Sequence, residues 1–103
     1  MDILKHCAVN NSPEFNMLKA LEECGEFSEV LIKIQTKRSD KRPALNEAIK
    51  EFGDVTYRGK IALMSLFPEA TLEQLEKEID NHINMKLTKL KGYLVANKDT
   101  KHL

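Results

Sequence analysis

The chain has 103 residues, of which 42% are hydrophobic and 31% charged, a balance that fits one small folded domain and excludes a disordered tail. Basic and acidic residues number 16 each, so the formal net charge is zero, which argues against a protein that binds nucleic-acid polymers. No stretch approaches the roughly 20 apolar residues of a membrane helix. Cys7 and Cys24 are the only cysteines, too few for a disulfide scaffold, so we expect the reducing cytoplasm. We expect a single domain over residues 1–103 that does not bind membranes.

The small number of glycine, proline and aromatic residues favours helices over a turn-rich β-structure. The segment from Met1 to Asn11 has room for one short helix. Ser12 followed by Pro13 is typical of a helix start, because serine caps free amides and proline suits the first position. A helix from Pro13 to Lys37 follows, with an apolar stripe at steps of three or four: Met17, Ala20, Leu21, Cys24, Phe27, Leu31 and Ile34.

Residues 37–42 form a strongly polar segment that we expect to be a loop. A second helix is expected from near Pro43 to Leu66, since Pro68 disfavours helical geometry at the residue before it. A third helix is expected to begin after Thr71, because Thr71 and Gln74 match the capping-box pattern. We expect this helix to end near Val95. Residues 97–103 are expected to be a frayed tail. The second and third apolar stripes are Leu45, Ala48, Ile49, Phe52, Val55, Gly59, Ala62, Leu63 and Leu66, and Leu72, Leu75, Ile79, Ile83, Leu87, Leu90 and Leu94.

These elements predict an all-α domain of three long helices, with a short N-terminal helix as an optional addition. A chain of this length buries a limited share of its unfolded surface. Its apolar stripes offer more surface than three helices hide among themselves. We therefore expect a homodimer or homotetramer with a four-helix-bundle core between subunits.

Acidic residues are concentrated at two places on the predicted helices. Glu23 and Glu26 lie three residues apart in the first, and Glu51 and Asp54 lie three apart in the second. Residues with this spacing share a helix face. Relative to the apolar stripes, the two pairs also occupy equivalent angular positions, so two antiparallel helices can present both pairs to one cleft.

Carboxylates placed this close repel one another unless a cation neutralises them. Magnesium prefers oxygen ligands and often completes its shell with water and substrate phosphates, and manganese is a plausible substitute. The spacing therefore predicts a site for magnesium-bound polyphosphate. Ordinary surface ion pairs are an alternative, because Lys19 and Arg58 stand four residues from Glu23 and Asp54.

The order Glu22-Glu23-x-x-Glu26, then Glu51-x-x-Asp54 after a gap of 24 residues, resembles the EExxE…ExxD signature of the MazG-like all-α nucleoside triphosphate pyrophosphatases. A later segment, Asn84-x-Lys86, is similar to an asparagine-x-lysine stretch near the end of that family's last helix. With the residues that flank these motifs, the resemblance covers about residues 16–94.

The resemblance implies hydrolysis of a nucleoside triphosphate, deoxy or non-standard, to the monophosphate and pyrophosphate. It implies that Glu23, Glu26, Glu51 and Asp54 hold magnesium. Glu22 is implied as a further ligand or as the group that orients the attacking water. The resemblance also extends to substrate binding, through phosphate contacts from Lys86 and Lys89 and sugar or base recognition by Asn84.

Two other functions fit parts of the sequence. Phosphoribosyl-ATP pyrophosphohydrolase belongs to the same helical superfamily, but that enzyme tends to carry a histidine soon after its second acid motif, where this chain has Arg58. A non-catalytic helical module that binds a protein partner is the second alternative. Four clustered acids argue against such a module, because it has no reason to tolerate their repulsion.

Overall fold

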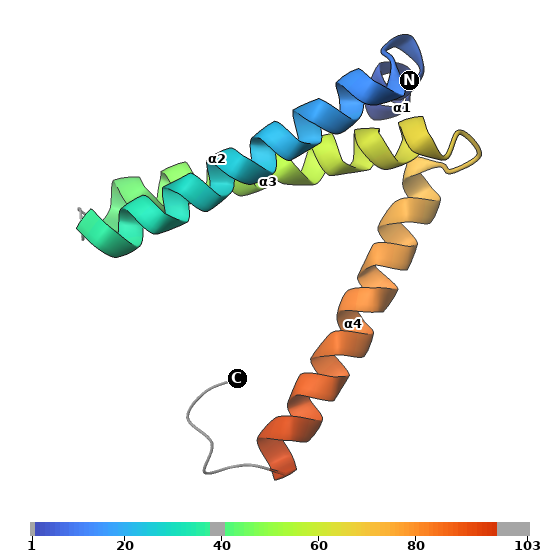
Figure 1. Cartoon of the computed structure of the whole chain (residues 1–103). Helices are drawn as coiled ribbons and strands as arrows, with labels where there is room; N and C mark the ends of the chain where they lie inside the picture. Colours follow the sequence, from blue (N-terminus) through green and yellow to red (C-terminus); the bar gives the residue numbers. More distant parts are fainter. Residues whose placement is uncertain (1, 38–40, 97–103) are drawn as a thin grey trace. The chain divides into compact units, whose positions relative to one another are not determined.

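The computed structural model describes residues 2–37 and 41–96, and it contains no strand within these ranges. Four helices follow one another along the chain (Figure 1), which confirms the all-α prediction. They are α1 (Ile3–Asn10), α2 (Pro13–Lys37), α3 (Lys41–Leu66) and α4 (Leu72–Ala96). The predicted tail at residues 97–103 lies outside the described residues. Within the described part of the chain, no helix is both long and apolar enough to cross a membrane.

Side chains cap the first two helices at their N-termini. The Asp2 carboxylate accepts a hydrogen bond from the Lys5 amide at 3.1 Å at the start of α1. The Ser12 hydroxyl accepts one from the Phe15 amide at 3.1 Å at the start of α2. These bonds satisfy amide groups that have no partner inside the helix. The predicted bounds of α2 and its serine cap are therefore confirmed.

Helix α3 begins earlier than expected. Its first residue is Lys41, two residues before Pro43, so Lys41 and Arg42 belong to the helix and not to the predicted loop. Proline is compatible with this position because the first four amides of a helix have no intrahelical acceptor. The remaining loop residues, 38–40, lie outside the described part of the chain.

Contacts divide the chain into two compact units, Met1–Leu72 and Glu73–Leu103. In the first unit, α2 and α3 lie side by side and antiparallel, and α1 packs on α3 (Figure 1). The fully buried Asn16 fixes this arrangement, because its amide nitrogen donates to the Ser65 hydroxyl at 3.1 Å and to the Ala8 carbonyl at 3.3 Å. The buried apolar residues are Ala8, Val30, Ala44, Ile61, Ala62, Met64 and Ala70.

Helices α2 and α3 meet along residues spaced seven apart, which two helical turns bring back to nearly the same face. We call this line the seam. It consists of Asn16, Glu23 and Val30 on α2 and of Ala44, Glu51, Arg58 and Ser65 on α3. Shorter residues occupy the two ends of the seam, and its middle consists of Glu23, Glu51 and Arg58.

The seam does not coincide with the predicted apolar stripes. Cys24 and Phe52, at the middle of the two stripes, are both exposed and lie about 100° from the seam on their helices. Equal rotations from the seam reach the same side of an antiparallel pair, which explains why the Phe27 and Phe52 rings are in contact, with centroids 5.3 Å apart. This apolar side comprises Leu21, Phe27, Leu31, Leu45, Ile49 and Phe52.

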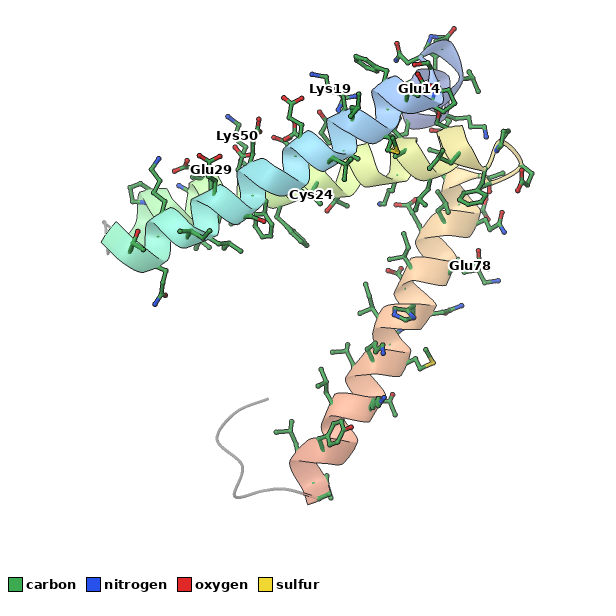
Figure 2. The ribbon with its side chains drawn as sticks, viewed as in Figure 1. Glu14, Lys19, Cys24, Glu29, Lys50 and Glu78 are labelled. Carbon is green, nitrogen blue, oxygen red and sulfur yellow. The ribbon has the colours of Figure 1, made fainter. Side chains whose placement is uncertain are left out.

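The opposite side of the pair carries charged residues, and we call it the acidic side. Figure 2 labels Lys19, Glu29 and Lys50 there, whereas Cys24 belongs to the apolar side. The acids of this side are Glu22, Glu26, Glu29, Glu47 and Asp54. The α2–α3 pair therefore has an apolar side and an acidic side, and the seam lies between them.

The connection between α3 and α4 is held by α1. The Lys5 ammonium donates to the Pro68 carbonyl at 2.7 Å and to the Ala70 carbonyl at 2.9 Å. Carbonyls that follow a helix end have no intrahelical donor, so a lysine from another helix satisfies them. Residue 5 thus fixes a turn more than 60 residues away in sequence.

The second unit contains α4, which buries none of its side chains. Ile83, Leu87, Leu90 and Leu94 lie on one face of the helix and are between 43% and 55% exposed. A helix with a continuous apolar face gains stability by covering that face.

Candidate functional site

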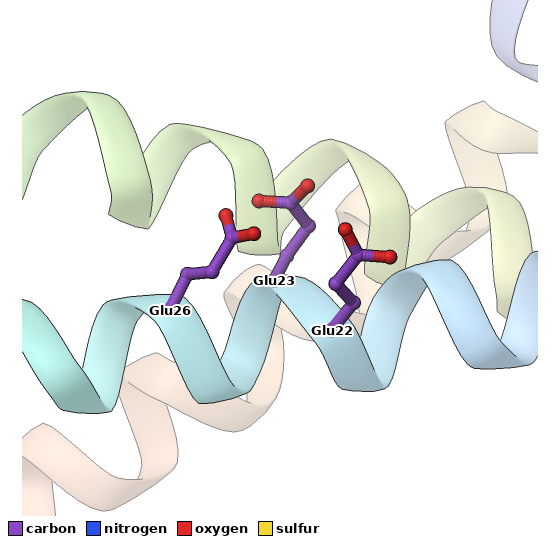
Figure 3. Close-up of side chains that lie close together, drawn as sticks. All are labelled: Glu22, Glu23 and Glu26. Carbon is purple, nitrogen blue, oxygen red and sulfur yellow. The ribbon is translucent and has the colours of Figure 1, made fainter.

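Three glutamates of α2 converge at the middle of that helix. Glu22, Glu23 and Glu26 each offer a carboxylate oxygen, and these oxygens lie within 4.8 Å of one another. Figure 3 shows the three side chains leaving α2 close together. The spacing of one and three residues on a continuous helix accounts for this convergence.

A second group of acids joins the two helices. Glu23 also lies with Glu51 and Asp54 of α3, and one carboxylate oxygen from each falls within 4.8 Å of the others. Glu23 therefore belongs to both groups, and the five acids form one continuous cluster. The structure thus brings together the four acids singled out as a set from their spacing and the neighbouring Glu22.

The two acids at the seam, Glu23 and Glu51, are partly shielded from solvent. Glu23 and Glu51 each have one carboxylate oxygen, Oε2, that is shielded from solvent and has no hydrogen-bond partner. Desolvation raises the pKa of Glu23 above the ordinary value of 4.5, and the nearby charges of Glu26 and Asp54 raise it further. The pKa of Glu51 is raised in the same direction by the same causes. Both groups therefore hold protons more tightly than ordinary glutamates do.

These observations fit a divalent cation bound through oxygen atoms. Two orphaned carboxylate oxygens and mutual repulsion are what a hard cation would relieve, and carboxylates are its preferred ligands. Glu26 and Asp54, which flank the two seam acids, carry carboxylates of the same kind. The five acids therefore supply the type of donor atom that magnesium and manganese prefer.

Surface ion pairing explains little of this cluster. Lys19 does form an ion pair, but with Glu22 at 3.5 Å and not with Glu23. Both partners are exposed enough to be largely screened by solvent. Among the described residues, Arg58 forms no ion pair with Asp54. The sequence alternative of two simple ion pairs therefore leaves Glu23 and Asp54 without partners.

A cleft of about 430 Å³ adjoins the cluster. It opens beside Glu26 and Glu51 and extends along α2 toward its C-terminal end. Its wall combines apolar and charged side chains: Glu26, Glu29, Val30, Ile32, Lys33, Glu47 and Glu51. A cleft next to a cation site is where the organic part of a metal-bound ligand would be held.

The predicted substrate-binding residues lie in the second unit. Asn84, Lys86 and Lys89 are all exposed residues of α4. Because α4 is a continuous helix, Asn84 and Lys86 flank opposite edges of its apolar face, about 160° apart. This separation is compatible with different predicted partners, phosphate for Lys86 and sugar or base for Asn84. Their role in binding substrate stays a prediction.

Sequence reasoning did not identify the cleft or the seam position of Arg58. Glu29, Lys33 and Glu47 carried no motif, and they reach the cleft only because α2 and α3 pair in this register. A usable signal for the register was present, since Asn16, Glu23 and Val30 are seven residues apart, as are Glu51 and Arg58. Polar residues at such positions are a feature of helix pairs with a specified register.

Comparison with known proteins gives no match: no protein-family model fits the chain, and no curated protein or solved structure is significantly similar to it. The resemblance to the MazG-like family therefore rests on the acid motifs and the Asn84-x-Lys86 segment of the sequence alone.

Proposed function

We propose that the chain is a magnesium-dependent nucleoside triphosphate pyrophosphohydrolase, which converts a deoxy or non-standard nucleoside triphosphate to its monophosphate and pyrophosphate. The observation that carries the proposal is the meeting of Glu22, Glu23 and Glu26 with Glu51 and Asp54, each group within 4.8 Å. Two different helices, α2 and α3, contribute to it. That arrangement is difficult to explain as a solvated surface, because it concentrates negative charge at a helix contact.

In this proposal Glu23, Glu26, Glu51 and Asp54 hold the metal. Magnesium, when bound, lowers the pKa of water and offsets negative charge on phosphoryl oxygens. Glu22 is the most exposed acid of the cluster on α2 and stands at its edge, where it orients the attacking water and accepts its proton. The shielded oxygens of Glu23 and Glu51 have no hydrogen-bond partner in the protein, so a bound cation would satisfy them.

The adjoining cleft supports a nucleotide as the substrate. Its apolar residues Val30 and Ile32 suit a base or sugar, and Lys33 supplies a positive charge among the acids. Lys86 and Lys89 are proposed to contact phosphate and Asn84 to contact sugar or base, within a reaction that takes place in the cytoplasm.

We also propose that the chain functions as a homodimer or homotetramer with a four-helix core between subunits. The exposed apolar side of the α2–α3 pair supports this assembly, since Leu21, Ile49 and Phe52 are 60%, 59% and 57% exposed. Its two helices have 25 and 26 residues, so two copies can pair along their whole length. The same apolar side would serve a heterologous partner in a non-catalytic module.

The decisive experiment measures pyrophosphate release from a panel of ribo-, deoxy- and modified nucleoside triphosphates, with magnesium and with excess chelator. We expect release from at least one nucleotide, in step with monophosphate formation and abolished by the chelator. Release of orthophosphate instead would indicate a different phosphohydrolase. Silence on every nucleotide would favour the non-catalytic module.

A further inference from the structure

The position of Arg58 carries an inference that deepens the proposed function and rests on it. Arg58 lies in the seam, two turns from Ser65 and two turns from Glu51. The contact between Asn16 and Ser65 sets the register at one end, and the group of Glu23, Glu51 and Asp54 sets it at the other. In this register Arg58 is level with Glu23 and follows Asp54 by one helical turn, so the residue stands at the edge of the acidic cluster along the seam.

Arg58 is held at this edge without a complete set of partners. Its Nε is shielded from solvent and makes no hydrogen bond. Its guanidinium lies over the ring of the neighbouring Tyr57, 5.2 Å from the centroid, which restricts its movement on one side. A buried donor without an acceptor is costly, so a group that supplies oxygen acceptors would be bound favourably.

The carboxylates of the cluster do not provide those acceptors. Within residues 2–37 and 41–96, no acid forms an ion pair with Arg58, although Asp54 is one helical turn away. In the proposed function the carboxylates bind a cation, so the guanidinium of Arg58 can bind another group. The guanidinium of Arg58 is therefore suited to a negatively charged group that binds together with the cation.

We propose that Arg58 binds the non-bridging oxygens of the substrate's terminal phosphates while the acids hold the metal on the same phosphates. A planar guanidinium with five donors is suited to paired phosphate oxygens, and a lysine at this place would supply a point charge only. The cleft adjoins the Glu26 and Glu51 end of the cluster, and Arg58 follows Asp54 at the other end. The nucleoside would therefore lie in the cleft with the phosphate chain directed toward Arg58.

The test uses the full chain and inorganic pyrophosphate as the probe. Calorimetric titration gives two affinities for each variant: that of manganese alone, and that of pyrophosphate in the presence of magnesium. For Arg58→Gln we expect manganese affinity to be unchanged or tighter, because a positive charge beside the acids is removed. We expect pyrophosphate affinity to fall by about tenfold to a hundredfold. Lys77→Gln, an equal charge change at an exposed residue of α4, controls for net charge.

Arg58→Lys is the second variant, and it decides the outcome if Arg58→Gln does not fold. It keeps the charge and loses the planar donor pair, so a loss of severalfold in pyrophosphate affinity supports the proposal. Pyrophosphate affinity equal to that of the parent in both folded variants overturns it and leaves the proposed function standing. Joint loss of manganese and pyrophosphate binding also overturns it, because that result indicates a structural role. A parent chain that binds neither probe overturns the proposed function itself.

Discussion

Glu51 takes part both in the packing of α2 against α3 and in the proposed metal site. It occupies the seam of α3, offers an oxygen to the group of Glu23 and Asp54, and has one oxygen, Oε2, without a hydrogen-bond partner. An acid in such a place is unfavourable for the folded state unless its charge is neutralised by a proton or a cation. Substitutions of this residue therefore separate folding from function.

Glu51→Gln is expected to abolish nearly all pyrophosphate release and to leave the metal-free protein as stable as the parent or more stable. The amide keeps the shape of the side chain and removes one of the repelling charges. Activity is measured as magnesium-dependent pyrophosphate release, and stability by urea unfolding followed by circular dichroism. Glu78→Gln, an exposed acid of α4, is the matched control. Full activity of Glu51→Gln would show that these acids are an ordinary solvated surface.

The raised pKa of Glu51 also predicts how the difference in unfolding free energy between Glu51→Gln and the parent depends on pH. Between 4.5 and the raised pKa, the folded chain keeps a proton on Glu51 that the unfolded chain has released. The contribution of Glu51 to the free energy of unfolding therefore falls as pH rises through this window. Glu51→Gln lacks that loss, so its stability relative to the metal-free parent increases as pH rises from below 4.5 to neutral.

Unfolding of parent and variant over this pH range, with chelator present, checks the sign. Glu23→Gln is expected to shift in the same direction, because the pKa of Glu23 is raised by the same causes. A stability difference that does not change with pH would contradict the interpretation.

At the scale of elements, α1 serves chiefly as an anchor. Lys5 donates two hydrogen bonds to carbonyls at the end of α3, and Ala8 is buried and accepts from Asn16. These contacts join the first residues of the chain to the turn that leads into α4. The position of that turn thus depends on an element of eight residues.

Lys5→Met is expected to lower the free energy of unfolding by about 1–2 kcal/mol, because two carbonyls lose a charged donor and the aliphatic packing is retained. Chemical unfolding followed by circular dichroism measures the loss. Lys77→Met, on the exposed surface of α4, is expected to change stability by less than about 0.5 kcal/mol. Equal effects of the two substitutions would mean that the two carbonyl contacts of Lys5 contribute nothing measurable.

For the whole molecule, the acidic cluster predicts that metal binding stabilises the fold. A ligand that binds only the folded state stabilises it by RT ln(1 + [L]/Kd), about 2.7 kcal/mol at a hundredfold excess over Kd. Magnesium or manganese is therefore expected to raise the melting temperature, and sodium at matched ionic strength is not. The rise should shrink in Glu51→Gln. An identical response to sodium and magnesium would indicate screening and not a specific site.

The apolar side predicts self-association. Light scattering at micromolar concentration is expected to give at least twice the chain mass of 11.8 kDa. Ile49→Glu places a charge in the middle of the apolar side and should produce monomers. Ile3→Glu, at a position of α1 that is 69% exposed, should not. A parent protein that is monomeric under these conditions would contradict the proposed four-helix core.

Local sequence signals were sufficient for the elements and for the choice of candidate acids. Ser12 and Pro13 set the start of α2 through interactions within one helical turn, and the predicted bounds agree with the structure. The start of α3 was misplaced because proline fits several positions of a first turn equally well. The spacing of Glu23 with Glu26 and of Glu51 with Asp54 indicated shared helix faces, because helical geometry alone determines it.

Only the tertiary structure decided which face of each helix meets the other. The apolar stripes around Cys24 and Phe52 favoured those faces, but the helices meet at a seam of short and polar residues that begins at Asn16 and Ser65. Register depends on how side chains from distant parts of the chain fit together, and hydrophobic periodicity does not contain that information. This register brings Glu23 of α2 to Glu51 of α3, leaves Arg58 beside them, and opens the cleft that Lys33 and Glu47 line.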